Sequence, residues 1–129
     1  MIWKYKIDLK EKDAIYEIEK ILDLRFPNDL LKYIKVGNAA TPEKNKIFVC
    51  GNERVVASML SFNKEENIED IYMFMNHVKM NRVIPFAIDP FGNLFVYFVD
   101  KQTVGFWNHE DDEYEDSALD IKAFFGAME

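Results

Sequence analysis

The chain has 129 residues, of which 49% are hydrophobic and 15% aromatic, so it is long and apolar enough to bury a packed core rather than remain disordered. Its formal net charge of −7 disfavours nucleic acids and anionic membranes as partners. The sequence has no signal-peptide pattern and no apolar run of the ~18 residues that a membrane span needs, and its single cysteine, Cys50, excludes an internal disulfide. We therefore expect one domain over residues 1–129 in a reducing, cytoplasmic setting.

The chain begins with a weakly alternating stretch and two predicted helices. Residues 2–7 fit either an edge strand or the approach to a helix. Helical spacing of apolar residues begins after Asp13, a candidate N-cap, and we expect Pro27 to close that segment. A second helix is predicted to start with Asn28 as its cap and to end at Gly37 in a left-handed conformation.

Two strands are predicted to follow a proline-containing loop at 39–45. The first covers 46–50, the second is an irregular strand over 54–62, and a Gly-Asn turn at 51–52 joins them. Strand residues alternate between two faces. On that basis we expect most strand aromatics to pack in the core, namely Phe48, Phe62, Phe86, Phe95 and Phe98.

The second half of the chain predicts one more helix and a meander. The helix is expected to open at Asn67, with Asp70 three residues later in the manner of a capping box. Three runs rich in β-branched and aromatic residues follow, at 83–88, 94–99 and 103–107. A turn with Pro, Gly and Asn separates the first two runs, and a short polar turn separates the second pair. The pattern predicts a three-stranded antiparallel meander.

A dense block of carboxylates follows the meander. The chain has no Lys or Arg between Glu110 and Asp120, and it has seven acidic residues there: Glu110, Asp111, Asp112, Glu113, Glu115, Asp116 and Asp120. The remaining 16 acidic residues equal the 16 basic ones in number, so this acidic segment accounts for the whole net charge. One interpretation is a solvated loop that leads to a last helix with Ser117 as its N-cap.

The other interpretation is a surface that attracts a cationic protein. Tyr114 is a residue type often used as an interface anchor, and Trp107 or Phe106 would add apolar contact if one of them faces outward. The candidate partner-binding residues are therefore Trp107, Glu110, Asp111, Asp112, Glu113, Tyr114, Glu115 and Asp116.

The order of elements predicts an α+β fold. Two helices, two strands, a helix, three strands and a helix give more hairpins than crossovers, so we expect a mainly antiparallel (mixed) sheet of about five to six strands with helices on its face and edges. A parallel α/β fold would require a regular alternation of strands and helices, which this order lacks.

The sequence offers no catalytic, metal or cofactor motif. The only histidines are His77 and His109, and neither has a context that marks it as a catalytic base. One histidine with flexible carboxylates is too little for zinc, and the run 111–116 lacks the alternating ligands and the glycine of an EF-hand. A Walker phosphate loop and a dinucleotide fingerprint are also absent from the sequence. We expect a protein that is not an enzyme and needs no cofactor.

Several segments together resemble the SUKH superfamily. Residues 26–31 with 36–38 are similar to its Leu-Pro, acidic, Asn-Gly helix, with Phe in place of Leu and the terminal pair inverted. Residues 84–89 with 92–95 are similar to its Ile-Pro-Phe-Ala-x-Asp and Gly-Asn hairpin. The Val-Gly-Phe-Trp run at 104–107 precedes an acidic stretch and a helix that ends in Phe-Phe, as in that family. The resemblance covers roughly residues 13–126.

This resemblance implies an α+β domain and a protein–protein role. The superfamily contains regulators related to fungal cell-wall synthesis and bacterial immunity proteins that bind and neutralise polymorphic toxins, often nucleases. The resemblance therefore implies an immunity protein that binds a toxin domain, and the acidic segment favours a basic partner. The alternative is a regulatory or scaffolding module that binds an endogenous protein or a small ligand through the loop at 37–45 and the aromatic side chains near it.

Overall fold

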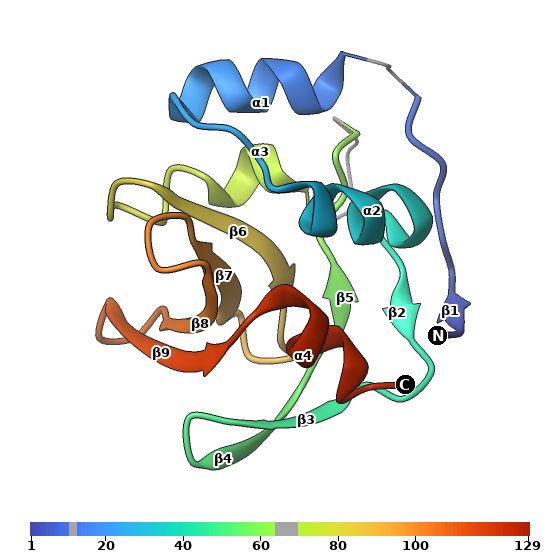
Figure 1. Ribbon diagram of the computed structural model, residues 1–129, viewed down its shortest axis with the longest axis vertical. Coiled ribbons are helices and arrows are strands. Elements are labelled where there is room, and N and C mark those ends of the chain that lie inside the picture. Colours follow the sequence, from blue (N-terminus) through green and yellow to red (C-terminus); the bar gives the residue numbers. More distant parts are fainter. Residues whose placement is uncertain (11–12, 64–69) are drawn as a thin grey trace.

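The computed structural model describes residues 1–10, 13–63 and 70–129 (Figure 1). Its helices are α1 (Ala14–Leu22), α2 (Asn28–Gly37), α3 (Ile71–Phe74) and α4 (Ile121–Gly126). Its strands are β1 (Trp3–Lys4), β2 (Thr41–Pro42), β3 (Lys46–Val49), β4 (Asn52–Val55), β5 (Ser58–Met59), β6 (Val83–Ile88), β7 (Leu94–Phe98), β8 (Thr103–Asn108) and β9 (Glu113–Leu119). Within these ranges, no helix is long and apolar enough to cross a membrane.

A five-stranded antiparallel sheet, in the order β5-β6-β7-β8-β9, forms the centre of the fold. Its middle three strands are the predicted meander, and every residue of β6 and β7 is buried. A bulge between Pro85 and Ala87 interrupts the pairing of β6 with β7, where proline has no N–H to donate to the ladder. The arrangement confirms the predicted α+β class and the antiparallel sheet.

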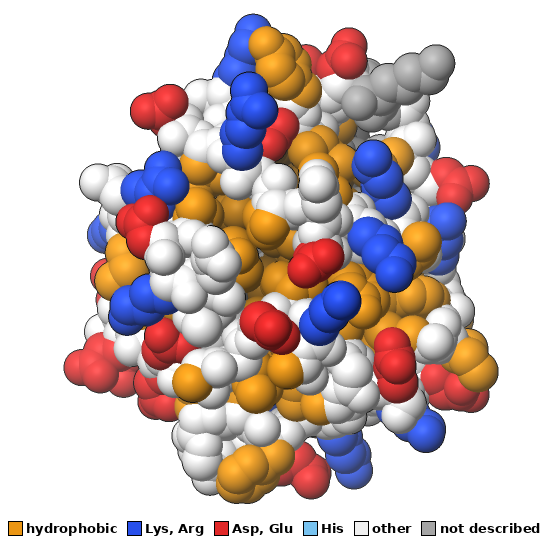
Figure 2. Space-filling model, viewed as in Figure 1, with side chains coloured by type: hydrophobic (Ala, Val, Ile, Leu, Met, Phe, Trp, Pro, Cys, Tyr) orange, Lys and Arg blue, Asp and Glu red, His pale blue; other side chains and the backbone are white. Residues whose placement is uncertain are grey.

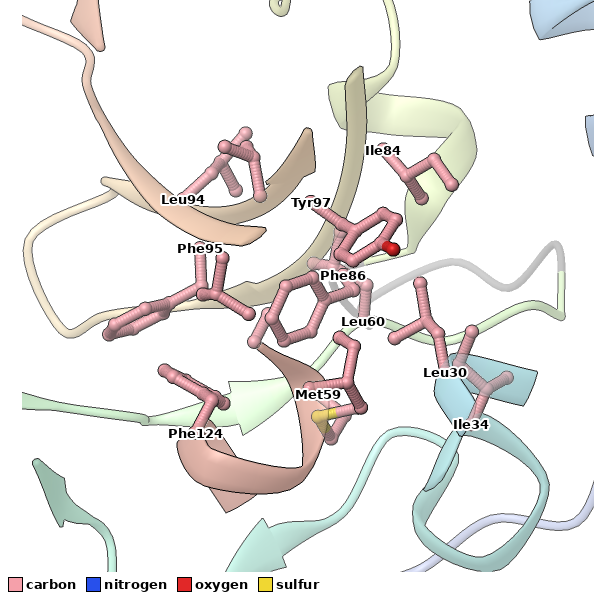
Figure 3. Close-up of a cluster of buried hydrophobic side chains, with 14 of the residues drawn as sticks. Leu30, Ile34, Met59, Leu60, Ile84, Phe86, Leu94, Phe95, Tyr97 and Phe124 are labelled. Carbon is pink, nitrogen blue, oxygen red and sulfur yellow. The ribbon is translucent and has the colours of Figure 1, made fainter. Parts of the chain in front are cut away.

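Helices α2 and α4 pack against one face of this sheet. Phe124 of α4 lies close to the buried rings of Phe86 and Phe95, while Leu30 and Ile34 of α2 lie on the Leu60 side of Phe86 (Figure 3). The Phe124 ring lies 5.6 Å from that of Phe86 and 5.5 Å from that of Phe95, between centroids. Edge-to-face and tilted ring pairs of this kind stabilise a core beyond the area they bury.

Two small two-stranded sheets flank the main one. In the β3–β4 hairpin, the turn residues are Cys50 and Gly51, both with positive φ (53° and 78°), so the turn lies one residue before the predicted one. Two left-handed residues match the twist of the flanking strands. The predicted strand 54–62 is divided between β4, which pairs with β3, and β5, which pairs with β6.

One strand aromatic is not in the core. Phe48 on β3 is 72% exposed, whereas its neighbours Ile47 and Val49 are buried. The alternation along β3 is therefore regular, and the aromatic residue lies on the outer face of the hairpin. The expectation of core packing is wrong for this residue and holds for Phe62, Phe86, Phe95 and Phe98.

The predicted ends of the first two helices need three corrections. Helix α1 ends at Leu22, well before Pro27, because Asp23 adopts a left-handed conformation (φ 53°) and closes it. Asn28 is the first residue of α2 rather than its cap. The left-handed residue after α2 is Ala39 (φ 61°), and Gly37 has a different role. A Cβ atom at Gly37 would lie 2.8 Å from the ring of Trp3, so glycine is needed there for close packing.

The other predicted helix caps hold only in part. Asp13 stands at the start of α1, but its side chain makes no capping hydrogen bond. The carboxylate of Asp70 caps α3 by accepting a hydrogen bond from the Met73 N–H at 2.9 Å. The predicted helix start at Asn67 lies outside the described residues. Ser117 is not the cap of α4, because it belongs to β9, and Asp120 takes that role with a 2.8 Å hydrogen bond from the Ala123 N–H.

Candidate functional site

The acidic segment forms an edge strand and the turn before it. Residues 109–112 connect β8 to β9, and β9 is the last strand of the main sheet. This corrects the interpretation of the segment as a loop, although Asp120 at its end does cap the last helix. Figure 2 shows Asp and Glu side chains gathered at the lower left, where Figure 1 places β9. The carboxylates are exposed at all seven positions: Glu110, Asp111, Asp112, Glu113, Glu115, Asp116 and Asp120.

Carboxylates within the acidic segment hold its turn in one shape. Asp112 accepts a 2.6 Å hydrogen bond from the indole nitrogen of Trp107, and Asp111 accepts one of 3.0 Å from the Glu113 N–H. Asp112 also has a positive φ of 57°, which Asp tolerates better than most residues. These contacts order the turn and leave its charges in water.

Trp107 itself is buried, with 5% of its surface exposed, and Phe106 is 2% exposed. Neither ring faces outward, so the condition under which they would contact a partner is not met. The contribution of Trp107 to the surface is to position Asp112.

Residues of β9 alternate between the two sides of the sheet. Tyr114 pairs with Trp107, and Glu115 pairs with Phe106 on the opposite face. Tyr114 is half-buried: its ring centroid lies 6.4 Å from that of Phe98, and its hydroxyl accepts a 3.3 Å hydrogen bond from the Met80 N–H. Burial raises the pKa of Tyr114, with a smaller contribution from the charge of Asp112. Tyr114 therefore fastens the acidic strand to the rest of the fold while part of its ring stays accessible.

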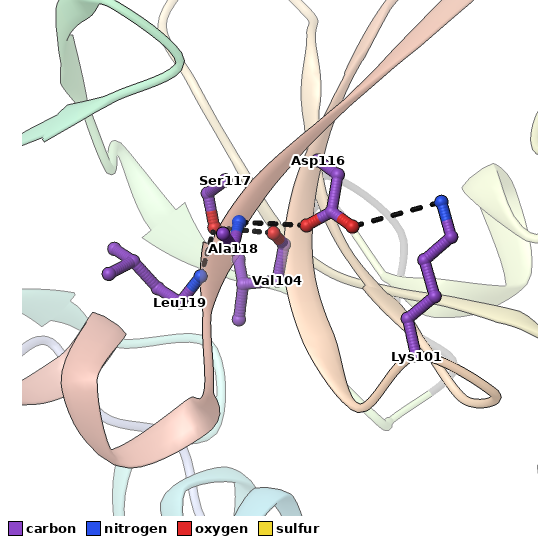
Figure 4. Close-up of polar contacts among 6 residues, drawn as sticks. All are labelled: Lys101, Val104, Asp116, Ser117, Ala118 and Leu119. Carbon is purple, nitrogen blue, oxygen red and sulfur yellow. Dashed lines mark hydrogen bonds and ion pairs between the residues drawn. The ribbon is translucent and has the colours of Figure 1, made fainter.

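The end of β9 is a bulge built by two side chains (Figure 4). Asp116 accepts a hydrogen bond from the Ala118 N–H at 2.8 Å, and the Ser117 hydroxyl donates to the carbonyl of Val104 while accepting from the Leu119 N–H. Because of this bulge, pairing with β8 jumps from Asp116 to Leu119. Bulges and charged residues at a sheet edge discourage uncontrolled pairing with other strands.

The β3–β4 hairpin packs against the other side of β9. The Arg54 guanidinium lies 3.8 Å from the centroid of the Phe106 ring, a cation–π contact. Cys50 at the hairpin turn interacts with Glu115, and burial together with this carboxylate raises the pKa of the thiol to about 11. The thiol is therefore protonated and unreactive at neutral pH. No pattern in the sequence indicates that Arg54 and Cys50 adjoin the acidic segment, since they lie far from it along the chain.

The two histidines contact different parts of the fold. The backbone N–H of His109 donates to the side chain of Asn93 at 3.1 Å, while the ring of His77 lies 5.7 Å from that of Phe74. In the part of the chain that the structure describes, no three His, Cys, Asp or Glu side chains come together so that they could hold a metal ion.

Comparison with known proteins identifies a family to which the chain is similar. A family model, SUKH_6, described as SMI1-KNR4 cell-wall, matches residues 12–125. This range includes α1, α2, α3 and the whole five-stranded sheet, together with α4 up to Phe125. No curated protein matches the chain.

Proposed function

The chain belongs to the SUKH_6 (SMI1-KNR4) family, and on this premise we propose that it is a non-enzymatic protein-binding module, an immunity protein that binds and neutralises a basic toxin domain. The family match confirms the resemblance that residues 26–38 and 84–107 suggested. The immunity role, the toxin and the surface used are our proposals.

The observation that carries this proposal is a fixed, exposed row of carboxylates with few cations beside it. Among the described residues, Lys101 is the only cation that forms an ion pair with this row, at 3.8 Å from Asp116. The charges of Glu110, Asp111 and Glu113 are thus available to an incoming protein. Such a field accelerates association with a cationic partner and discriminates against acidic ones.

The partner chemistry follows from the sign of the charge. Nuclease toxins must bind a polyanion, so their active-site clefts carry Lys and Arg. A rigid row of carboxylates can occupy such a cleft in place of phosphates. The proposed partner-binding residues are Glu110, Asp111, Asp112, Glu113, Tyr114, Glu115 and Asp116, with Trp107 as the residue that positions Asp112.

The alternative, a regulatory module that uses the loop at 37–45, has less support from the geometry. Gly37, Asn38, Ala40 and Pro42 are buried. The Asn38 side chain donates to the Ile7 carbonyl at 2.9 Å and accepts from the Phe62 N–H at 2.8 Å, so it joins three segments of the fold. These four of the nine loop residues therefore serve the core, and the exposed residues of the loop are Glu43 and Lys44, at a small pocket beside the two ends of the chain.

Co-expression with the toxin domain encoded beside this gene tests the proposal. Survival of the host, followed by co-purification of the two proteins, is the expected result. Survival without a complex would argue against neutralisation by binding. Neither survival nor a complex would favour the regulatory alternative and leave the fold unaffected.

A further inference from the structure

An exposed phenylalanine lies beside the acidic turn. Phe91 is 78% exposed at the tip of the β6–β7 turn, next to exposed Pro90. Phenylalanine is a residue type that folding usually buries. Its ring here adds almost nothing to the core, so the stability of this fold does not explain why an aromatic residue occupies the turn.

The turn that carries Phe91 is rigid. The buried carboxylate of Asp89 accepts hydrogen bonds from the Phe91 N–H at 2.9 Å, from the Asn93 N–H at 2.8 Å and from the Asn93 amide at 3.0 Å. Gly92 supplies the positive φ (87°) that closes the turn. A ring on such a support loses little conformational entropy on binding, which favours affinity.

The same turn is connected to the acidic one. The His109 N–H donates to the Asn93 side chain at 3.1 Å, and a Cβ atom at Gly92 would lie 3.6 Å from the His109 imidazole. Residue 109 begins the turn that carries Glu110, Asp111 and Asp112. The β6–β7 and β8–β9 turns therefore lie side by side at one end of the sheet, one carrying Phe91 and the other the carboxylates.

We propose that Phe91 is the apolar anchor of the partner-binding surface. The partner that this surface binds is a folded cationic protein, and Phe91 enters an apolar pocket on it that Lys or Arg residues border. This inference rests on the proposed function and adds to it a contact outside the acidic segment. The tip of a turn is convex, so it enters a pocket on a partner and does not enclose a small ligand. The neighbouring carboxylates set the sign of the charge around that pocket.

The two parts of this surface have different kinetic roles. Exposed charges act at long range and mainly set the association rate. An aromatic ring acts only after contact, when its surface leaves water, so its loss mainly increases the dissociation rate.

The chain offers a matched control, because Phe48 is also a solvent-exposed phenylalanine, at 72%. It lies on the outer face of the β3–β4 hairpin, opposite Glu53. The experiment compares wild type, Phe91→Ala and Phe48→Ala for binding to an inactivated form of the toxin domain encoded beside this gene, by surface plasmon resonance at one salt concentration. Thermal melts first establish that both variants fold.

The expected result is that Phe91→Ala weakens binding by at least about tenfold, mostly through faster dissociation, while Phe48→Ala changes it by less than about twofold. Equal effects of the two variants, or wild-type affinity for Phe91→Ala, would overturn the anchor and leave the proposed function standing. No binding by the wild-type protein would remove the proposed function and the anchor together.

Discussion

The indole nitrogen of Trp107 and the carboxylate of Asp112 are joined by a 2.6 Å hydrogen bond. One partner is a buried residue of the sheet, and the other belongs to the acidic turn between β8 and β9. The bond therefore gives a highly charged, exposed turn a fixed position relative to the core. A fixed turn presents its charges in one arrangement, which is what selective recognition of a cationic surface requires.

Removal of this bond should cost stability. Asp112→Gly deletes the acceptor without backbone strain, since φ is positive at this position, and leaves the buried indole N–H unsatisfied. We expect the free energy of unfolding to fall by about 1–3 kcal/mol, measured by urea denaturation. Asp112→Asn is the control, because it removes the charge and keeps an oxygen acceptor. Equal losses from both substitutions would contradict this role of the hydrogen bond.

Gly105 should not tolerate a side chain. An added Cβ would lie 2.1 Å from the Phe98 ring and 2.7 Å from the Glu115 carbonyl oxygen, so either β9 or the ring must move. We expect Gly105→Ala to lower the free energy of unfolding by about 3 kcal/mol, the upper part of the usual range for overpacking.

Gly126→Ala is the matched control for that substitution. The space around Gly126 is open, and the residue ends α4 without a left-handed φ, so alanine should leave stability unchanged or raise it by roughly 0.5 kcal/mol. Near-wild-type stability of Gly105→Ala would show that the sheet edge adapts more easily than this geometry indicates.

The thiol of Cys50 should react only at high pH. Burial and the neighbouring Glu115 raise its pKa from an ordinary value of 9.0 to about 11, and alkylation requires the thiolate. The rate of reaction with iodoacetamide in the folded protein should therefore reach half its maximum near pH 11. Because the folded-state pKa is raised, the stability linked to this group is present below pH 9.0 and is lost as the pH rises toward 11.

Glu115→Gln separates the two causes of that shift. It removes the negative charge but not the burial, so the midpoint of alkylation should fall part of the way toward 9.0. A wild-type midpoint near 9.0, or no change in Glu115→Gln, would mean that the β3–β4 hairpin does not hold the thiol against β9.

The meander was predictable because local and tertiary preferences agree there. The strands β6, β7 and β8 consist mostly of β-branched and aromatic residues, and the turn between β6 and β7 contains Pro, Gly and Asn, which favour tight turns. The turn between β7 and β8 is less typical, because Gln102 has the positive φ (58°) there. The strand boundaries match the predicted ones within one residue.

The acidic strand was not predictable from local preference. Glu, Asp and Ser are poor strand formers, so local preference predicts a loop at residues 113–119. Pairing with β8 and the hydrogen bond between the Tyr114 hydroxyl and the Met80 N–H outweigh that preference. Gly37 illustrates the same limit. Its position after a helical stretch is typical of a left-handed end, whereas its actual requirement is the Trp3 ring, which is distant in sequence.

The charged residues of the candidate site could be predicted from the sequence, but the residues that lie beside them in the fold could not. Counting residues located the carboxylates, and all of those in the turn and on β9 are exposed as expected. The proximity of Phe91 and Arg54 to the acidic segment depends on the pairing of strands and on hairpin packing, which a one-dimensional pattern does not contain.

The association rate with the toxin domain encoded beside this gene tests the central claim most directly. It would be measured by stopped-flow at low and moderate salt, for wild type and for a variant without five of the carboxylates. Asn replaces Asp and Gln replaces Glu in this variant, so that oxygen acceptors for hydrogen bonds remain. The replaced residues are Asp111, Asp112, Glu113, Glu115 and Asp116. A charge-matched control neutralises five exposed carboxylates elsewhere: Asp13, Glu17, Asp23, Asp29 and Glu43.

The account predicts that the first variant folds, associates at least about tenfold more slowly at low salt and loses most of its salt dependence, while the control remains close to wild type. Unchanged association of the folded first variant, or an equal slowing in the control, would contradict the claim that this acidic edge of the sheet is where the partner is recognised.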